Sequence, residues 1–456
     1  MNKKLNLIFN ILIIALYIFI TVFTMFHHEI WRDEAQVWLV VRDLNLFGII
    51  DHVRYEGHPL LWYMIVLPFA KLGLPVIFMQ AVSLIFMIAA ALIFVFKSPF
   101  NIITKISILF STAFIYWLSI ISRNYSLIPF FVFTTALLYP KQKTHPYFYA
   151  ISLALLSQTH VLTSAFCAGM GILFGYENII KNKENKEKFV WPLLIIFLPL
   201  IILCLYIFSS QNQNASIVNF NEHGEKTLWK SFTSMLVYTY GYVSNIKGFF
   251  ITALLLICSA VIFIENKKLF AVFLTSFVYQ ICVYTYIWQS SSEKAALFFV
   301  ILIFCFWLIL NTKKLSKPKQ IVYNLLLITI FGINTGLGIN LVKNDISYDY
   351  SGSKNTAKFI KENINKEDTI ITNNPVFTSS IAAYLPDRKF YYEKEKRFVT
   401  FGYDIRKPEK TETTKGKKYY LYSSITVPEQ KMLYKSKPYT LIATENFYIS
   451  EDKLKE

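Results

Sequence analysis

Long apolar runs separated by short polar stretches are the dominant pattern along this chain. A helix needs roughly 17–25 apolar residues to cross a bilayer. The stretch 60–72 is apolar but short, and Pro68 interrupts it. The pattern predicts an all-α, multi-pass membrane domain of about eleven transmembrane helices over residues 1–342. The candidate runs are 5–26, 75–96, 103–119, 125–139, 147–158, 161–178, 189–209, 247–264, 269–287, 295–311 and 321–341.

Lysines fall in alternate connections between these runs, which gives an orientation. Positive residues collect in cytoplasmic loops, so the pattern predicts a cytoplasmic N-terminus in the cytoplasmic (plasma) membrane. No small-residue cleavage site follows the first run, which predicts an uncleaved span. An odd number of spans then puts the segment after residue 342 on the outer side. The lysines lie at 3, 4, 97, 105, 141, 143, 267 and 268 and within the segments 181–188 and 313–319.

The pattern changes at about residue 343. The segment 351–364 has the period of an amphipathic helix, and "PVFTSSIAAYL" reads as a helix opened by proline. Short strand-like stretches follow, including "DTIIT", "KFYY", "KKYYLYS" and "YTLIATENFYI". Residues 343–456 are therefore expected to form a small extracytoplasmic α/β domain. The domain has no GxGxxG and no P-loop, so no nucleotide site is predicted there.

Composition agrees with a membrane protein and narrows its partners. Only 16% of the residues are charged and 54% are hydrophobic, whereas soluble domains carry about 25% charged residues. The net charge of +17 fits cytoplasmic loops and anionic headgroups. We therefore expect membrane lipids as partners and no nucleic acid. The five cysteines all lie within apolar runs without a CxxC pair, which predicts neither disulfides nor a zinc site.

Candidate chemistry is concentrated in the first outer loop, residues 27–58. If a helix begins near residue 33, Asp33 lies at the edge of its polar face and Glu34 falls on its apolar face. A carboxylate on an apolar face needs a hydrogen-bonding partner. Asp33 followed by Gln36 also fits a helix-capping pattern, so a purely structural role for Asp33 stays open.

The motif "RYEGHP" places Glu56 and His58 at the end of the same loop. One interpretation is a turn with interfacial polar groups, since glycine and proline flank the histidine. The other is a second carboxylate and an imidazole that serve the pocket of Asp33. The spacings match neither a zinc nor a calcium motif. No metal ligand and no cofactor are assigned, and a divalent cation remains an open alternative.

Three later outward connections carry further candidates. Arg123 and Tyr125 lie in "SRNYS", and the planar guanidinium of arginine suits a phosphate. His160 lies in "SQTHV", and Lys294 lies in "SSSEKAA". Each has a structural alternative: headgroup contact for the arginine, a core position for the histidine, and a surface pair with Glu293 for the lysine.

The ordered motifs "WRDEAQ", "YEGHP", "RNY" and "TH" resemble bacterial members of the GT-C superfamily of membrane glycosyltransferases. That superfamily includes dolichyl-phosphate-mannose protein mannosyltransferases and lipid A aminoarabinose transferases. The likeness is specific over the first 180 or so residues. Many relatives have a second proline where this chain has Leu60.

The resemblance implies an inverting transfer of a sugar from a polyprenyl-phosphate carrier to a protein, glycan or lipid acceptor outside the cell. It implies Asp33 as the general base and Glu34 as a second catalytic carboxylate. The implied substrate-binding residues are Glu56, His58, Arg123, Tyr125, His160 and Lys294.

Two other classes of function stay open. A transporter or flippase of a lipid-linked saccharide would use the same polar groups without breaking a bond. Transporters, however, often have broken helices and sites near the bilayer midplane, whereas these groups cluster on one side. A non-catalytic envelope assembly protein would use the outward domain as its interaction module.

Overall fold

The computed structural model describes residues 3–181, 185–208, 227–241, 244–402, 413–423, 432–436 and 445–453. The chain divides into two compact units. The first, called here the helical unit, contains Met1–Val22, Val53–Trp62 and Ser83–Val342. The second, called the mixed unit, contains Phe23–His52, Tyr63–Val82 and Lys343–Glu456. Two segments of the N-terminal region therefore belong with the tail domain.

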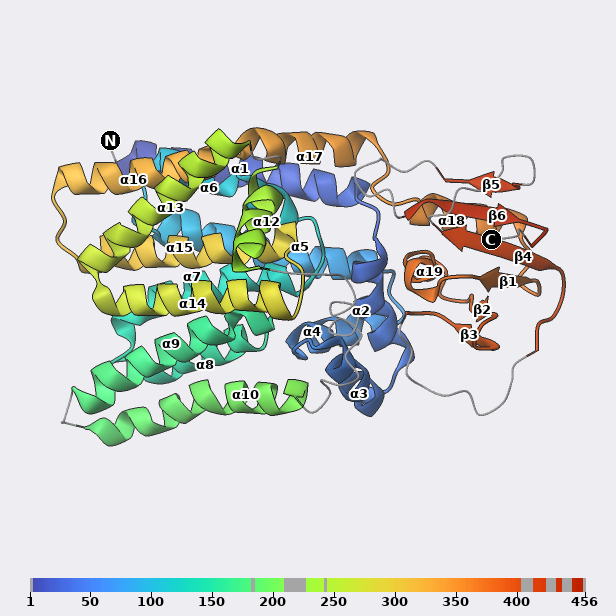
Figure 1. Ribbon diagram of the computed structural model, residues 1–456, viewed down its shortest axis with the longest axis horizontal. Helices are drawn as coiled ribbons and strands as arrows, with labels where there is room; N and C mark the ends of the chain where they lie inside the picture. Colours follow the sequence, from blue (N-terminus) through green and yellow to red (C-terminus); the bar gives the residue numbers. More distant parts are fainter. Residues whose placement is uncertain are drawn as a thin grey trace. The chain divides into compact units, whose positions relative to one another are not determined.

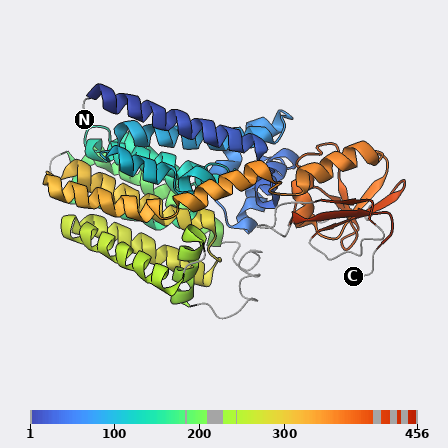
Figure 2. The same cartoon turned by 90° about the horizontal axis from the view of Figure 1, so that it is seen from above.

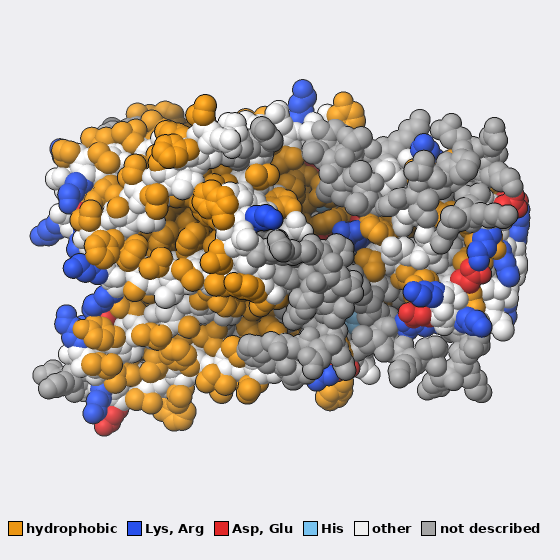
Figure 3. Space-filling model, in the orientation of Figure 1, with side chains coloured by type: hydrophobic (Ala, Val, Ile, Leu, Met, Phe, Trp, Pro, Cys, Tyr) orange, Lys and Arg blue, Asp and Glu red, His pale blue; other side chains and the backbone are white. Residues whose placement is uncertain are grey.

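The helical unit is a bundle of helices that run roughly alongside one another (Figures 1 and 2). Its surface is largely apolar (Figure 3), as expected of side chains that face lipid. Its α-helices are α1 (Lys3–His27), α5 (Ile77–Lys97), α6 (Ile102–Leu109), α7 (Leu127–Leu138), α8 (Pro146–Ser157), α9 (Ser164–Gly175), α10 (Val190–Phe208), α12 (Leu228–Tyr240), α13 (Asn245–Glu265), α14 (Lys267–Tyr286), α15 (Ser292–Thr312), α16 (Lys317–Gly332) and α17 (Thr335–Ser347).

Within the described residues, seven helical segments are long and apolar enough to cross a membrane. They confirm a mostly helical, multi-span protein. Four predicted runs form shorter α-helices instead, α6 to α9. Turns of other geometry interrupt them, such as the π-helical turn Ala113–Trp117 after α6 and the 3₁₀ turn Tyr139–Lys141 after α7. The expected outer loop 210–246 contains α12, while residues 209–226 and 242–243 lie outside the described residues.

Basic side chains gather at one end of the helical unit, where α1 begins and where α13 meets α14 (Figure 3). Helix α5 ends at Lys97, α14 begins at Lys267, and α16 begins at Lys317. The alternating lysines of the sequence therefore share one end of the bundle. The connections that hold Arg123, His160 and Trp288 follow the opposite ends of the helices.

The core of the helical unit is built around α15, whose side chains are buried from Ala295 to Ile309. Aromatic rings fill the space beside it. Trp307 lies 5.6 Å from Phe133 and 6.1 Å from Phe94 between ring centroids. Contacts of this kind hold helices together where lipid provides little hydrophobic driving force.

The mixed unit contains a six-stranded sheet in the order β3-β2-β1-β4-β6-β5. Strand β1 pairs in parallel with β2 and β4, and the other pairs are antiparallel. Helix α19 connects β1 to β2. The elements are α2 (Arg32–Asp43), α3 (Leu46–Glu56), α4 (Leu61–Lys71), α18 (Ser353–Asn363), β1 (Thr369–Thr372), α19 (Pro375–Ala382), β2 (Phe390–Tyr392), β3 (Arg397–Val399), β4 (Lys418–Ser423), β5 (Tyr434–Lys435) and β6 (Phe447–Ser450).

The strand-like stretches of the sequence match this sheet. "DTIIT" forms β1, "KFYY" forms β2, "KKYYLYS" forms β4, and the end of "YTLIATENFYI" forms β6. Residues 437–444 lie outside the described residues. The predicted helices at 351–364 and at "PVFTSSIAAYL" are α18 and α19. The expected C-terminal α/β fold is confirmed as a mixed sheet with helices.

Close packing at Gly338 gives a test of the helical unit. A Cβ there would lie 2.8 Å from Cγ2 of Ile115 and 3.0 Å from Cα of Thr112, whereas one at Gly336 meets nothing within 4 Å. Gly338→Ala should lower the free energy of unfolding by about 1–3 kcal/mol through overpacking. Gly336→Ala should raise it by roughly 0.5–1 kcal/mol through helix propensity. Thermal unfolding of both variants measures this, and shifts of equal sign would contradict the packing.

Candidate functional site

The candidate site of the helical unit centres on the imidazole of His160, between α8 and α9. Its Nδ1 accepts a hydrogen bond from the backbone N–H of Leu162 at 3.0 Å. Burial lowers the pKa of His160 well below its ordinary value, and the nearby His58, Lys294 and Arg123 lower it further. The ring is therefore neutral, and its single proton must be on Nε2.

The Nε2–H of His160 is a buried donor, and no acceptor for it occurs in the described part of the chain. A buried donor without an acceptor costs about 1–3 kcal/mol, so natural proteins rarely retain one without a reason. An oxygen atom of a bound ligand would satisfy it. The local backbone fixes this donor, because the Leu162 contact sets the tautomer.

Three other rings surround His160. The ring centroid of Tyr125 lies 4.9 Å away, that of His58 lies 5.8 Å away, and that of Trp288 lies 5.9 Å away. His58 and Trp288 are 6.1 Å from one another. These residues come from four separate connections of the chain. The fold therefore brings together His58, Tyr125 and His160, which the sequence singled out, and adds Trp288 to them.

Two cations border these rings. The guanidinium carbon of Arg123 lies 5.4 Å from the Tyr125 ring centroid, and Nζ of Lys294 lies 5.9 Å from the Trp288 ring centroid. Glu293 lies 3.9 Å from Arg123, which is longer than a hydrogen bond. Lys294 donates a hydrogen bond to the backbone oxygen of Gln289 at 3.2 Å.

We call this group the donor cluster: His58, Arg123, Tyr125, His160, Trp288 and Lys294. It combines cations and N–H donors with flat apolar rings, which suits an anion attached to an apolar or sugar group. Helix α3 begins in the mixed unit, but its last residues fall in the segment Val53–Trp62 of the helical unit, and Glu56 at its end is half-buried. Trp288 was missed by sequence reasoning, although it lies just before α15, whose first turn supplies Lys294.

Asp33 and Glu34 belong to the mixed unit, in the first turn of α2. The side chain of Asp33 is 36% exposed and lies 3.5 Å from the Nε atom of Arg32. The side chain of Glu34 is fully buried. Two neighbouring carboxylates thus have opposite surroundings, because successive positions on a helix face different sides.

The capping role considered for Asp33 is wrong. Helix α2 begins at Arg32, and its N-cap residue is Trp31. Glu34 supplies the capping contact by accepting the N–H of Trp31 at 3.3 Å. Gln36, the expected partner of the cap, instead exchanges two hydrogen bonds with the backbone of Gly402 at 2.8 and 3.0 Å.

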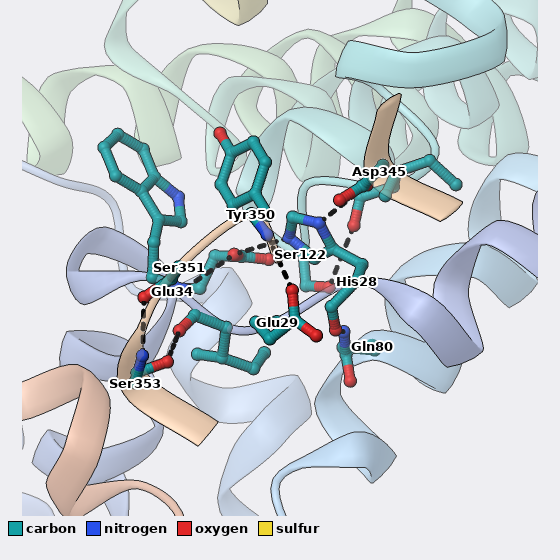
Figure 4. Close-up of polar contacts among 12 residues, drawn as sticks. His28, Glu29, Glu34, Gln80, Ser122, Asp345, Tyr350, Ser351 and Ser353 are labelled. Atoms are coloured by element: carbon teal, nitrogen blue, oxygen red, sulfur yellow. Dashed lines mark hydrogen bonds and ion pairs between the residues drawn. The ribbon is translucent and has the colours of Figure 1, made fainter. Parts of the chain in front are cut away.

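A buried charge network holds Glu34 in place (Figure 4). His28 lies between two carboxylates, with Nε2 3.1 Å from Glu34 and Nδ1 2.9 Å from Asp345. Burial alone would lower the pKa of His28, but Asp345 and Glu34 outweigh it and hold this pKa well above its ordinary value. The expectation that Glu34 needs a partner is therefore confirmed.

Two further buried carboxylates fix the backbone near α2. Glu29 accepts the N–H of Tyr350 at 2.7 Å, and Glu445 accepts the N–H of Arg32 at 2.8 Å. Burial raises the pKa of Glu29 to about 7, although the Tyr350 N–H and His28 act in the opposite direction. Burial likewise raises the pKa of Glu445 to about 7, against the hydrogen bonds from Ser351 and Arg32.

Sequence reasoning missed Asp345 and Glu445 because each contacts α2 or its flanks across more than 300 positions. The histidines near residue 28 were the only local signal. Among the described residues, no group of three or more histidines, cysteines or acidic residues could hold a metal ion. Comparison with known proteins adds no relative: no protein-family model matches the chain, and no curated protein matches its sequence.

The raised pKa values of Glu29 and Glu445 predict a pH-dependent stability. Both groups keep a proton to about pH 7 when folded, but only to about 4.5 when unfolded. The folded state therefore binds more protons in this window, and the free energy of unfolding should fall as pH rises from 4.5 to 7. Glu445→Gln should reduce that dependence by about 1–3 kcal/mol.

The matched control is Glu451→Gln, which alters a half-exposed carboxylate of the same unit. Thermal unfolding at several pH values compares the three proteins. His28 acts in the same direction, because its raised pKa adds stability that is lost as pH rises through the folded value. A wild-type stability that increases between pH 4.5 and 7 would contradict the assignment.

Proposed function

We propose that this chain is a membrane glycosyltransferase that moves a sugar from a polyprenyl-phosphate carrier to an acceptor on the outer side of the cytoplasmic membrane. The observation that carries the proposal is the donor cluster around the buried Nε2–H of His160. A phosphate oxygen is an acceptor that would satisfy this donor. Arg123 and Lys294 would add the positive charge that a departing phosphate needs.

The chemistry of the carrier fits the composition of the cluster. A polyprenyl phosphate brings its charge to the membrane surface while its tail stays in lipid. The cluster offers fixed donors for the phosphate and aromatic rings for the adjoining sugar or first isoprene unit. No nucleotide-binding motif is needed when the donor is lipid-linked, and the chain has none.

The proposed orientation rests on the lysine-rich end of the bundle. Lysines at that end favour the cytoplasm, which supports a donor cluster on the outer side. The parity of the spans supports the same assignment. Seven helical segments are long enough to cross, and four shorter predicted spans would bring the total to eleven. Both counts are odd, which favours a tail on the outer side.

The proposed reaction is an inverting displacement at the anomeric carbon. The acceptor hydroxyl oxygen forms a bond to that carbon, and the bond from carbon to the phosphate oxygen breaks with its electron pair leaving on the phosphate. Asp33 takes the hydroxyl proton as general base. Asp33 is preferred to Glu34 because its side chain is accessible, whereas Glu34 is buried against His28.

The resemblance to GT-C glycosyltransferases supports this reading. The motifs "WRDEAQ", "YEGHP", "RNY" and "TH" contribute Asp33, His58, Arg123, Tyr125 and His160. The last four belong to the donor cluster although they are spread over about a hundred positions. Glu34 then becomes a positioning residue in the proposal rather than a catalytic one, because it contacts His28 and the start of α2.

Binding of the carrier tests the donor cluster. His160→Phe keeps an aromatic ring but removes the N–H donor, and Arg123→Ala removes the guanidinium. Each should weaken binding of a polyprenyl monophosphate by about tenfold or more, because a hydrogen bond to a charged group contributes about 1.5–3 kcal/mol. His145→Phe makes the same exchange at the exposed lysine-rich end and should leave affinity unchanged. Equal affinities in all four proteins would refute the phosphate site.

Asp33→Asn separates an enzyme from a transporter. The change should lower sugar transfer by about 10²–10⁴-fold, because it removes the general base, while carrier binding stays at the wild-type level. Transfer is measured by mass spectrometry of the released carrier phosphate in nanodiscs. Normal transfer by Asp33→Asn would remove this residue from the mechanism. Carrier binding without turnover in the wild type would favour a flippase.

A further inference from the structure

A cleft of about 590 Å³ lies on the sheet of the mixed unit. Its lining includes residues at the carboxyl ends of the three parallel strands. These are Thr372 and Asn373 at the end of β1, Tyr392 and Glu393 at the end of β2, and Tyr422 near the end of β4. Strand β1 has β2 on one side and β4 on the other. The chain order thus reverses at β1, and ligands bind at such points beyond the carboxyl ends of parallel strands.

Two tyrosines form the wall of the cleft. Tyr420 and Tyr422 are two positions apart on β4 and so share one face of the sheet. Their rings are nearly parallel, with an interplanar angle of 20° and centroids 6.5 Å apart. Tyr448 lies opposite Tyr422 on β6 and does not line the cleft. Each tyrosine offers an apolar face together with a polar hydroxyl.

Asn373 supplies a polar group that needs a partner. Its Oδ1 atom is buried, and no hydrogen-bond donor to it occurs in the described part of the chain. The next residue, Asn374, is occupied differently, because its Oδ1 caps α19 by accepting the N–H of Val376 at 3.1 Å. A ligand with hydroxyl groups could donate to the Asn373 oxygen.

An ion pair crosses the cleft. Nζ of Lys453 lies 2.6 Å from a carboxylate oxygen of Glu393, and both side chains are about half exposed. Glu393 follows β2 and Lys453 follows β6, and these strands flank β1 and β4 in the sheet. The charged residues that line the cleft are Glu393, Lys394 and Lys453. Glu393 and Lys453 thus neutralise one another. The Glu393–Lys453 pair can still form hydrogen bonds with a ligand, but its net charge is zero.

We propose that this cleft binds a neutral saccharide chain, with a sugar ring against Tyr420 and Tyr422 and its hydroxyls on Asn373, Glu393 and Lys453. The C–H face of a sugar suits the negative face of an aromatic ring, and its hydroxyls both donate and accept. The volume is within the 300–1,000 Å³ usual for small-ligand sites. That the bound saccharide is the acceptor rests on the proposed glycosyltransferase function. That the cleft binds a saccharide does not depend on it.

Direct binding tests the cleft. The full chain is placed in lipid nanodiscs, because maltoside detergents carry sugars of their own, and is titrated with cellopentaose, chitopentaose and maltopentaose. Saturation-transfer NMR and calorimetry report binding. At least one of these should bind the wild type, and Tyr420→Ala or Asn373→Ala should weaken that binding about tenfold or more. Tyr448→Ala, on the same sheet face outside the cleft, should bind as the wild type does.

The outcomes separate this inference from the proposed function. If Tyr420→Ala loses saccharide binding while Tyr448→Ala and Arg123→Ala retain it, the result supports a saccharide site that is separate from the donor cluster. Equal binding by Tyr420→Ala, Asn373→Ala and wild type overturns the cleft assignment even if sugar transfer occurs. Wild-type protein that binds none of the three neutral chains, or that binds only an anionic polymer such as a polyphosphate, also overturns it. Circular dichroism checks that each variant is folded.

Discussion

A single buried imidazolium organises the mixed unit. His28, Glu34 and Asp345 all belong to the mixed unit, and Asp345 comes from a distant segment of the chain, so one cation joins two separate segments of this unit. Breaking a buried pair by removing one partner costs about 3–5 kcal/mol, because the remaining charge is left uncompensated. These segments of the mixed unit cannot separate while the charge stays balanced. The conformation of the first turn of α2, and with it the position of Asp33, depends on this balance.

The two units use charge in opposite ways. In the mixed unit, carboxylates surround His28 and keep it protonated. In the helical unit, burial and nearby cations keep His160 neutral. A protonated histidine between carboxylates is a structural link, whereas a neutral histidine with a fixed tautomer and a buried N–H is a ready donor. The same residue type therefore has two roles, which its neighbours decide.

The sequence predicted the helical character, the C-terminal α/β domain and most members of the donor cluster. Apolar runs report local periodicity, which is why the helices and strands could be predicted from the sequence. The interruptions at Ala113–Trp117 and Tyr139–Lys141 could not be, because the apolar pattern continues through them. The partners of Glu34 were also out of reach. Its place on the apolar face predicted that a partner exists, but Asp345 reaches it through His28, which the tertiary fold brings together with both carboxylates.

Asp33 and Glu34 illustrate how adjacent residues divide a task. Their side chains differ by one position on a helix, and their exposures are 36% and 0%. The buried carboxylate is committed to His28 and to the backbone of Trp31, so moving it would disturb the unit. The exposed carboxylate is not the helix cap, and in the proposed mechanism it meets the acceptor. A group that transfers protons must reach the reacting atom, and a group that fixes geometry must not move. In the proposed mechanism the pair therefore acts together, because Glu34 holds the helix turn that presents Asp33.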